Sequence, residues 1–330
     1  MKYAKLGNTD IEVSKICIGG MSFGEASKNF HEWTLNQEES TKMIKEAYDL
    51  GVNFIDTANC YSFGTSEQYI GKALKELQIP RDKIVIASKV YFNEGKLSKQ
   101  AIKREIEKTL TNLQTTYLDL YQIHRFDYDT PILEVMEALN DLVKEGKVRA
   151  IGASAMYGYQ FHNMQVIAEK YGLTLFSTMQ NHYNLLYRED EREMIPICKQ
   201  YNVSLIPYSP LAGGHLTHTG WSSSSLRSQK DNTLRKKYDR DKDNDLLIIE
   251  RVNELAKKYH VSMAQISLAW LFKKGITSAI VGATKLNHFV DATKAVDLNI
   301  SDEDVAFLEE LYIHKPIVGP VSYTHLRAHE

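Results

Sequence analysis

The sequence predicts an α/β protein that forms a single (β/α)8 TIM barrel with a short N-terminal β-hairpin. Short apolar runs alternate with amphipathic helices from Lys15 to about Asp297, a pattern typical of a parallel sheet built from strand-helix-strand units. There are eight such runs, the number that closes a barrel. Three of them stop at an ionisable residue, and the C-terminal ends of barrel strands are where active-site groups gather.

Each predicted element follows from local patterns. The strands are expected at residues 16–20, 52–56, 84–88, 118–123, 149–153, 176–180, 203–208 and 278–282. Apolar residues repeat at helical spacing between them, for example from Ile132 to Val143 before Gly146. The expected helix starts are Ser98, Thr130 followed by Pro131, and the capping-box pairs Thr65 with Gln68 and Ser262 with Gln265.

Composition points to a small-molecule partner. The chain of 330 residues is 43% hydrophobic and 25% charged, with a formal net charge of -2, which favours neither nucleic acid nor an anionic membrane surface. No run approaches the roughly 18 apolar residues of a membrane span. The three cysteines lack metal-ligand spacing and the N-terminus carries no apolar signal region, so a cytoplasmic location is expected. Nothing in the sequence indicates the oligomeric state.

Two segments interrupt the alternation. The polar stretch from Ser209 to about Asp245 is too long for an ordinary connection, so it is either a functional flap, expected to fold over bound cofactor, or a partly disordered insertion. The last ten residues, VSYTHLRAHE, follow neither a helical nor a strand period. The barrel is therefore expected over residues 1–320, with residues 321–330 a non-native or disordered tail.

Four residues carry the predicted chemistry. Asp56, Lys89 and His124 end three successive strands, and Tyr61 follows the aspartate by five positions. Such a group suits carbonyl reduction, in which a proton donor must neutralise the charge that develops on oxygen. Tyr61 is the expected donor, with its pKa lowered by the Lys89 ammonium, Asp56 pairs with that ammonium, and His124 orients the substrate oxygen.

Other interpretations of the same residues stay open. Each could be a structural side chain when taken singly, and a lysine at a strand end also suits an imine-forming lyase. A zinc site is disfavoured because only His124 and Asp56 approach each other, and no metal ligand set is predicted. Neither a G-x-S-x-G elbow nor a P-loop is present.

A dinucleotide would have to bind without a Rossmann motif, because no G-x-G-x-x-G follows a strand. Barrels can bind a phosphate at the loops after strands seven and eight. Here those loops read IPYSPLAGG and AIVGATKLNHFVDA, and their small residues allow a pyrophosphate to approach the backbone.

The chain resembles the aldo-keto reductases over essentially residues 1–320. The runs LGNTDIEVSKICIGGMSFG, GASAMY, PYSPLAGG and IVGATK carry the likeness, and QIHRFDYDTPI and QNHYNLLYREDEREM suggest the bacterial branch of NADP(H)-linked oxidoreductases. The resemblance implies reversible NADPH-dependent reduction of aldehydes or ketones, with Asp56, Tyr61, Lys89 and His124 as the catalytic tetrad. It also implies the following cofactor contacts, with Asp56 as a further one: Gly20 and Met21 under the nicotinamide ribose, Ser154 and Gln180 on the carboxamide, Tyr208 on the nicotinamide ring, Ser209, Leu211 and Gly213 on the pyrophosphate, and Gly282, Thr284, Lys285, His288 and Asp291 at the adenosine end.

The chain departs from the family pattern in places. Ala155 stands where the family often has Asn, which removes one amide contact. Lys285, His288 and Arg227 are the candidate cations for a 2'-phosphate, so NADPH is favoured over NADH. Relatives of this kind suggest two further alternatives. One is a nucleotide-binding regulatory subunit without catalysis. The other is 1-deoxyxylulose-5-phosphate synthase, a name that some relatives carry, although the sequence contains no thiamine-diphosphate motif. Five residues that follow strand ends either form the walls of an aromatic substrate pocket or only pack the loops: Phe23, Tyr91, Phe126, Met156 and Tyr157.

Overall fold

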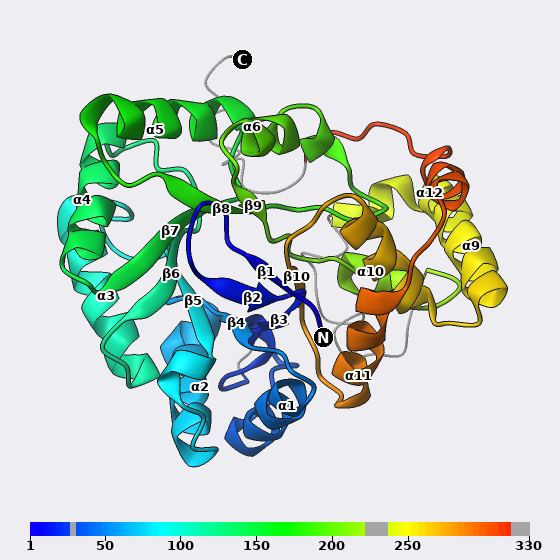
Figure 1. The fold of residues 1–330 in the computed structure, drawn as a ribbon, viewed down its shortest axis with the longest axis horizontal. Coiled ribbons are helices and arrows are strands. Elements are labelled where there is room, and N and C mark those ends of the chain that lie inside the picture. Colours follow the sequence, from blue (N-terminus) through cyan, green and yellow to red (C-terminus); the bar gives the residue numbers. More distant parts are fainter. Residues whose placement is uncertain (27–30, 222–236, 318–330) are drawn as a thin grey trace.

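A computed structural model describes residues 1–26, 31–221 and 237–317. Its main sheet has eight parallel strands, surrounded by helices (Figure 1). In sheet order the strands are β10 (Ala279–Val281), β3 (Ile16–Gly19), β4 (Phe54–Asp56), β5 (Val85–Val90), β6 (Leu118–Ile123), β7 (Val148–Ser154), β8 (Phe176–Gln180) and β9 (Ser204–Leu205).

The two edge strands of this sheet face each other. Backbone hydrogen bonds run from Thr277 N to Leu205 O at 3.0 Å and from Ile280 N to Pro207 O at 3.1 Å. These bonds connect β10 to β9 and complete the ring of a TIM barrel. All eight predicted strands are present, although those predicted at 52–56, 203–208 and 278–282 are shorter than expected.

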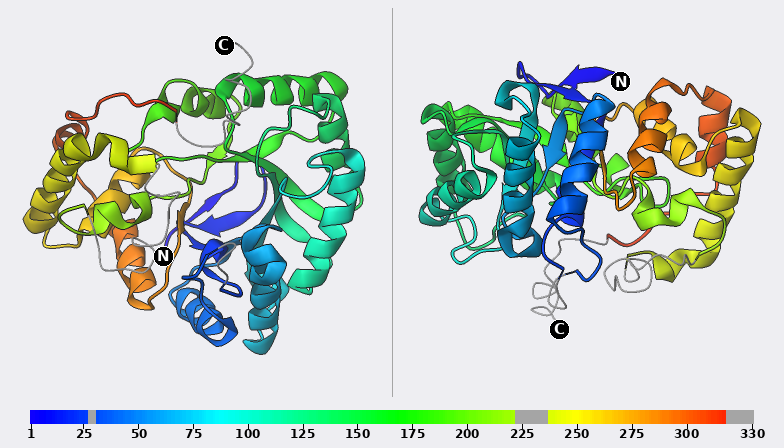
Figure 2. Two further views of the ribbon diagram at one scale, coloured as in Figure 1. Left: turned by 180° about the vertical axis from the view of Figure 1, so that it is seen from behind. Right: turned by 90° about the horizontal axis from the view of Figure 1, so that it is seen from below.

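The predicted N-terminal hairpin is confirmed and closes one end of the barrel. Strands β1 (Tyr3–Lys5) and β2 (Glu12–Ser14) pair antiparallel just before β3 begins, and Figure 2 shows the hairpin lying across the barrel end. Leu6, Ile11 and Val13 are buried in the cluster that fills the barrel interior. This end therefore holds apolar packing, and the opposite end, where the strands finish, is left for polar side chains.

Helices form the outer layer around the strands, and their buried apolar residues join the main hydrophobic core (Figure 1). Their bounds are α1 (Gln37–Asp49), α2 (Thr65–Glu76), α3 (Lys99–Leu113), α4 (Ile132–Lys144), α5 (Gly158–Tyr171), α6 (Met194–Gln200), α9 (Lys242–Tyr259), α10 (Met263–Lys273), α11 (Asn287–Lys294) and α12 (Asp302–Glu309).

Three predicted helix boundaries are confirmed, at Ser98, Ser262 and Gly146. The Ser98 and Ser262 side chains accept hydrogen bonds from the third backbone N–H of α3 and α10, and Gly146 follows α4 with a φ of +72°. Two predicted caps are wrong. Thr130 donates to Asp127 instead of capping α4, and Thr65 is the first residue of α2, after Gly64.

The long polar stretch after β9 is more ordered than a simple loop. It contains a 3-10 turn at Ala212–Thr217, and α9 begins already at Lys242. The Trp221 indole donates to the Asp239 carboxylate at 2.8 Å, which brings together the two described ends around residues 222–236. Those intervening residues, which include Arg227, lie outside the described residues, as does the predicted tail 321–330. The predicted closing motion over cofactor stays a prediction.

Candidate active site

Strand alternation places the candidate catalytic residues at the open end of the barrel. Phe54 and Ala87 belong to the interior apolar cluster. Side chains two residues apart share a face of a strand, so Asp56 and Lys89 point into the same interior one pleat further along. Both are buried, at 2% and 0% exposure. The barrel thus ends in charged groups immediately above its apolar filling.

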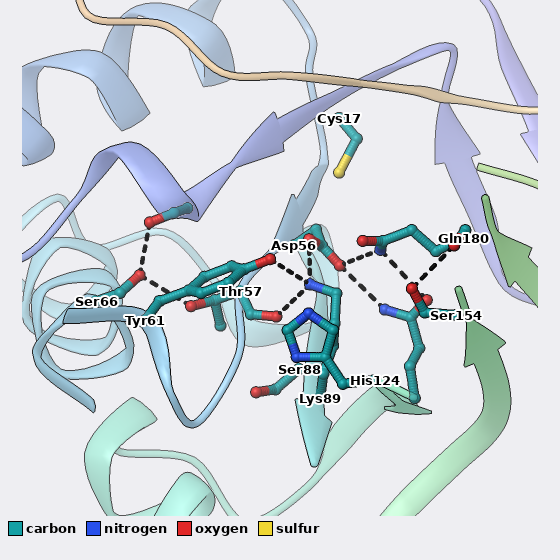
Figure 3. A network of polar contacts seen from close by, with 12 residues as sticks. Cys17, Asp56, Thr57, Tyr61, Ser66, Ser88, Lys89, His124, Ser154 and Gln180 are labelled. Carbon is teal, nitrogen blue, oxygen red and sulfur yellow. Dashed lines mark hydrogen bonds and ion pairs between the residues drawn. The ribbon is translucent and has the colours of Figure 1, made fainter. Parts of the chain in front are cut away.

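A buried ion pair forms the centre of the site (Figure 3). Lys89 Nζ lies 2.6 Å from Asp56 Oδ2 and donates a second hydrogen bond to the Thr57 carbonyl at 2.7 Å. The other carboxylate oxygen of Asp56 accepts from Gln122 Nε2 at 3.0 Å and from Gln180 Nε2 at 2.8 Å. Both charges are therefore compensated and hydrogen-bonded, which is the condition for keeping an ion pair buried.

Tyr61 completes the group on the side away from Gln180. Lys89 Nζ donates to its hydroxyl at 3.3 Å. Burial raises the pKa of Tyr61 to about 12, although the Lys89 ammonium acts in the opposite direction. Lys89 does lower this pKa, as expected, but desolvation of the phenolate outweighs the attraction, so the net shift is upward. The phenol is therefore fully protonated at neutral pH.

Lys89 stays charged in this setting. Burial lowers its pKa, but the charges of Asp56 and Tyr61 and their hydrogen bonds outweigh it, so the pKa lies above the ordinary lysine value. An ammonium held in this way is a poor nucleophile, because imine formation needs the free amine. The geometry therefore disfavours the lyase interpretation.

His124 lies against the tyrosine and is neutral. Its ring packs edge-on against Tyr61 and Phe92, with centroid separations of 5.8 and 5.1 Å. Burial, together with Lys89 and Arg125, holds its pKa well below the ordinary value. Its Nδ1 lies 3.9 Å from the Cys60 sulfur, and burial raises the pKa of that thiol to about 11. A protonated thiol facing Nδ1 favours the tautomer with the proton on Nε2.

The residues expected at the nicotinamide lie beside the tetrad. Ser154 Oγ donates to the Gln180 carbonyl at 2.9 Å, and both side chains are buried. The Tyr208 ring stacks on His182 at 5.1 Å, and His182 stacks in turn on Tyr187 at 4.2 Å. Tyr208 is thus supported from behind, as a ring that has to stack on a planar ligand needs to be.

The loop after β9 has the backbone expected for pyrophosphate binding. Ser209, Ala212, Gly213 and Gly214 all have positive φ, and a Cβ added at Gly214 would touch nothing within 4 Å. Turns of this kind can form anion-binding concavities. Here the N–H groups of Ala212 and Gly214 already donate to the carbonyls of Ser209 and Leu211, at 3.0 and 2.9 Å. Leu211, the other residue expected here, is partly buried between them.

The residues expected at the adenosine end follow β10. Gly282, Thr284, Lys285 and His288 are exposed around the start of α11. Asp291, by contrast, accepts hydrogen bonds from Ser262 and Gln265 at the start of α10. Its carboxylate therefore already has a structural role in joining two helices.

Gly20 and Met21 lie at the end of β3, in the 3-10 turn Gly20–Ser22. A Cβ at Gly20 would lie 2.9 Å from the Asp56 carbonyl, so only glycine fits beside the tetrad. Lys285 supplies an exposed cation at one end, whereas burial and the charge of Lys285 lower the pKa of His288, which is left as a neutral hydrogen-bonding imidazole. With this pair at one end and a supported ring at the other, the residues present fit a nicotinamide dinucleotide.

The expected aromatic substrate pocket is only partly correct. Phe126, Met156 and Tyr157 line one pocket, with Tyr208 and His182. Phe23 instead is 1% exposed and packs in the core, because it lies under the loop that carries Ser62. Tyr91 packs edge-on against Phe92, outside this pocket.

Two residues of the site were missed. Gln122 and Thr57 were not predicted, yet each hydrogen-bonds one member of the ion pair. The signal for Gln122 was available, since it lies two residues after the interior residue Leu120 and two before His124. The signal for Thr57 was not, because it acts through its backbone carbonyl.

Within the described residues, no three His, Cys, Asp or Glu side chains converge as metal ligands would. Over the same residues, no helix combines the length and the apolar character required to cross a bilayer.

Comparisons with known proteins agree with the geometry. The model of the protein family described as "Aldo/keto reductase family" matches residues 15–313. Versiconal hemiacetal acetate reductase of Aspergillus parasiticus is 40% identical over 341 residues, covering 96% of this chain and 98% of that protein. A candidate aryl-alcohol dehydrogenase of Schizosaccharomyces pombe is 43% identical over 353 residues, covering 97% of this chain and 98% of that protein.

A solved structure, the thermostable aldo-keto reductase Tm1743 in complex with the inhibitor epalrestat, superposes with a TM-score of 0.77. It is 27% identical and covers 94% of this chain and 100% of its own. The expectation of a bacterial branch is not supported, because the most similar curated relatives named here are fungal. The chain belongs to the aldo/keto reductase family, and it is an oxidoreductase acting on carbonyl or alcohol groups.

Proposed function

We propose that this protein reduces aldehydes or ketones to alcohols with NADPH, and that Tyr61 donates the proton. The observation that carries the proposal is the 3.3 Å contact between the Tyr61 hydroxyl and a buried lysine that Asp56 keeps charged. Bound NADPH would supply the hydride to the carbonyl carbon. Ser154 and Gln180 would hold its carboxamide, and Lys285 and His288 its 2'-phosphate.

The chain's own residues would manage the oxygen. His124 donates a hydrogen bond from Nε2 that orients the carbonyl oxygen. As negative charge develops there, Tyr61 transfers its phenolic proton to that oxygen and the product alcohol forms. The Lys89 ammonium stabilises the phenolate left behind, which lowers the barrier even though the resting phenol has a high pKa. Water then returns a proton to Tyr61.

Aromatic carbonyl compounds are the substrate class that the pocket favours. Phe126, Tyr157 and Tyr208 line it, and flat rings suit aromatic ligands. The names of the relatives, an aryl-alcohol dehydrogenase and a reductase of a hemiacetal acetate, support a substrate of this kind.

A Tyr61→Phe variant tests the proposal. It removes the proton donor and keeps the ring, so NADPH binding followed by fluorescence titration should not change. Turnover of nitrobenzaldehyde should fall by about 10²-fold or more, the scale of lost general-acid catalysis. Tyr91→Phe is the matched control, since Tyr91 also follows a strand end but lies outside the tetrad.

Wild-type turnover in Tyr61→Phe would show that another group donates the proton. A wild-type protein that binds NADPH but reduces no aldehyde would favour the alternative of a regulatory subunit. Borohydride trapping of a carbonyl compound on Lys89 would favour the lyase.

A further inference from the structure

An aromatic pocket lies between the loops that follow β6, β7 and β8. Five of its wall residues are aromatic: Phe126, Tyr128, Tyr157, Tyr187 and Tyr208. The pocket is not the barrel interior. Gln180 points inward to Asp56, so its neighbours Met179 and Asn181, which line the pocket, point to the opposite face of β8.

Asn181 brings an unsatisfied amide to this pocket. Its side chain is 2% exposed, and neither amide atom has a hydrogen-bond partner among the residues the structure describes. Its backbone carbonyl is already used by Tyr208 N at 2.9 Å. Buried polar groups in native proteins are nearly always paired, so an amide with no well-formed hydrogen bond on either atom indicates that a further partner can bind there.

Asp190 adds a carboxylate to the same pocket. Its two acidic neighbours are occupied: Glu189 accepts from the Tyr312 hydroxyl at 2.8 Å, and Glu191 pairs with Arg188 at 2.8 Å. Over the described part of the chain, Asp190 has no such cation. Burial, and then the charge of Glu189, raise its pKa to about 6, with a hydrogen bond from the Asn181 amide offsetting part of the effect. The carboxylate is therefore largely buried without a neutralising cation, and its remaining acceptor positions are open to a further donor.

We propose that Asn181 and Asp190 form a subsite that binds the hydrogen-bond donor of an aromatic ligand, either a hydroxyl or an ammonium group. The aromatic walls would hold the ring, and they would also favour an ammonium through cation–π attraction. Asp190 accepts the donor, and Asn181 can serve the ligand as donor and acceptor at once. The inference rests on the proposed function only in that such a ligand would be the carbonyl substrate or its alcohol product.

Equilibrium binding to the full chain tests the subsite without requiring turnover. Calorimetry at pH 7.5 would compare 4-hydroxybenzyl alcohol, 4-(aminomethyl)benzyl alcohol and the donor-free 4-methylbenzyl alcohol. The hydroxyl or the ammonium ligand should bind about tenfold or more tighter than the methyl analogue, because a charge-assisted hydrogen bond is worth about that factor. Whichever of the two ligands binds more tightly than the methyl analogue identifies the donor group, hydroxyl or ammonium, that the subsite accepts.

Two variants locate the effect. Asp190→Asn and Asn181→Leu should each lower the preference at least about threefold and leave the affinity of the methyl analogue unchanged. Asp10→Asn, a change at an exposed acid at the other end of the barrel, should leave every affinity unchanged.

Equal binding of the three ligands to the wild type, or no binding of any, would overturn the proposal. So would a preference that persists in both variants. Failure of aldehyde reduction with these binding differences intact would instead remove the proposed function and leave the subsite standing.

Discussion

Asp190→Asn should make the protein more stable at neutral pH, and the gain should depend on pH in a defined way. The pKa of Asp190 is raised from 3.8 to about 6, mainly by burial. The folded protein therefore binds the Asp190 proton more tightly than the unfolded chain does. The stability of the wild type should fall as pH rises from about 4 to about 6, and should remain lower above that range.

The magnitude follows from the two pKa values. The difference between 3.8 and about 6 corresponds to about 3 kcal/mol at 1.36 kcal/mol per pH unit. Because Asp190 is only partly buried, solvent screening reduces the expected gain to about 1–2 kcal/mol. Asparagine has nearly the same shape and no charge, so it should recover this amount at pH 7.5.

Urea unfolding at pH 7.5 and at pH 4.5 would measure the effect. The variant should be more stable at the higher pH, with the difference shrinking at the lower one, whereas Asp10→Asn should change stability by less than about 1 kcal/mol at both. A variant as stable as the wild type at pH 7.5, or less stable, would refute the reasoning. It would mean that Asp190 has a cationic partner in solution.

Three further changes test the packing around the site. Lys89→Met leaves the Asp56 carboxylate buried without its cation, so the free energy of unfolding from urea titration should fall by about 3–5 kcal/mol and turnover should be lost; unchanged stability would mean that Asp56 is not buried in solution. Asn181→Leu removes an unpaired buried amide, so the melting temperature should rise, by an amount equivalent to about 1–3 kcal/mol, and a fall would reveal an internal partner. Gly71→Ala places a methyl group 2.6 Å from a carbonyl of α3 and should lower the free energy of unfolding by about 1–3 kcal/mol. At Gly146 an added methyl group meets nothing within 4 Å, so Gly146→Ala should cost only the strain of its positive φ, about 1 kcal/mol. Equal losses of the two variants in urea titration would contradict this reasoning.

Local patterns in the sequence were enough to predict the scaffold. Strand alternation and helical periodicity depend on residues a few positions apart, so all eight strands could be located from the chain alone. The same alternation placed Asp56, Lys89 and His124 at the ends of neighbouring strands. The prediction failed where one local signal competed with another, as at Thr130, whose hydroxyl bonds to Asp127 instead of capping α4.

What the charged groups do was decided only by the tertiary structure. The contacts that define the site join residues far apart in the chain, such as Asp56 with Gln180, 124 positions away. The desolvation that raises the pKa of Tyr61 and of Asp190 comes from packing by several elements at once, and no local pattern encodes it. For the same reason three consecutive acids, Glu189 to Glu191, look alike in sequence but differ in the fold. Glu189 and Glu191 have strong partners, whereas Asp190 faces an aromatic pocket and has no cation among the described residues.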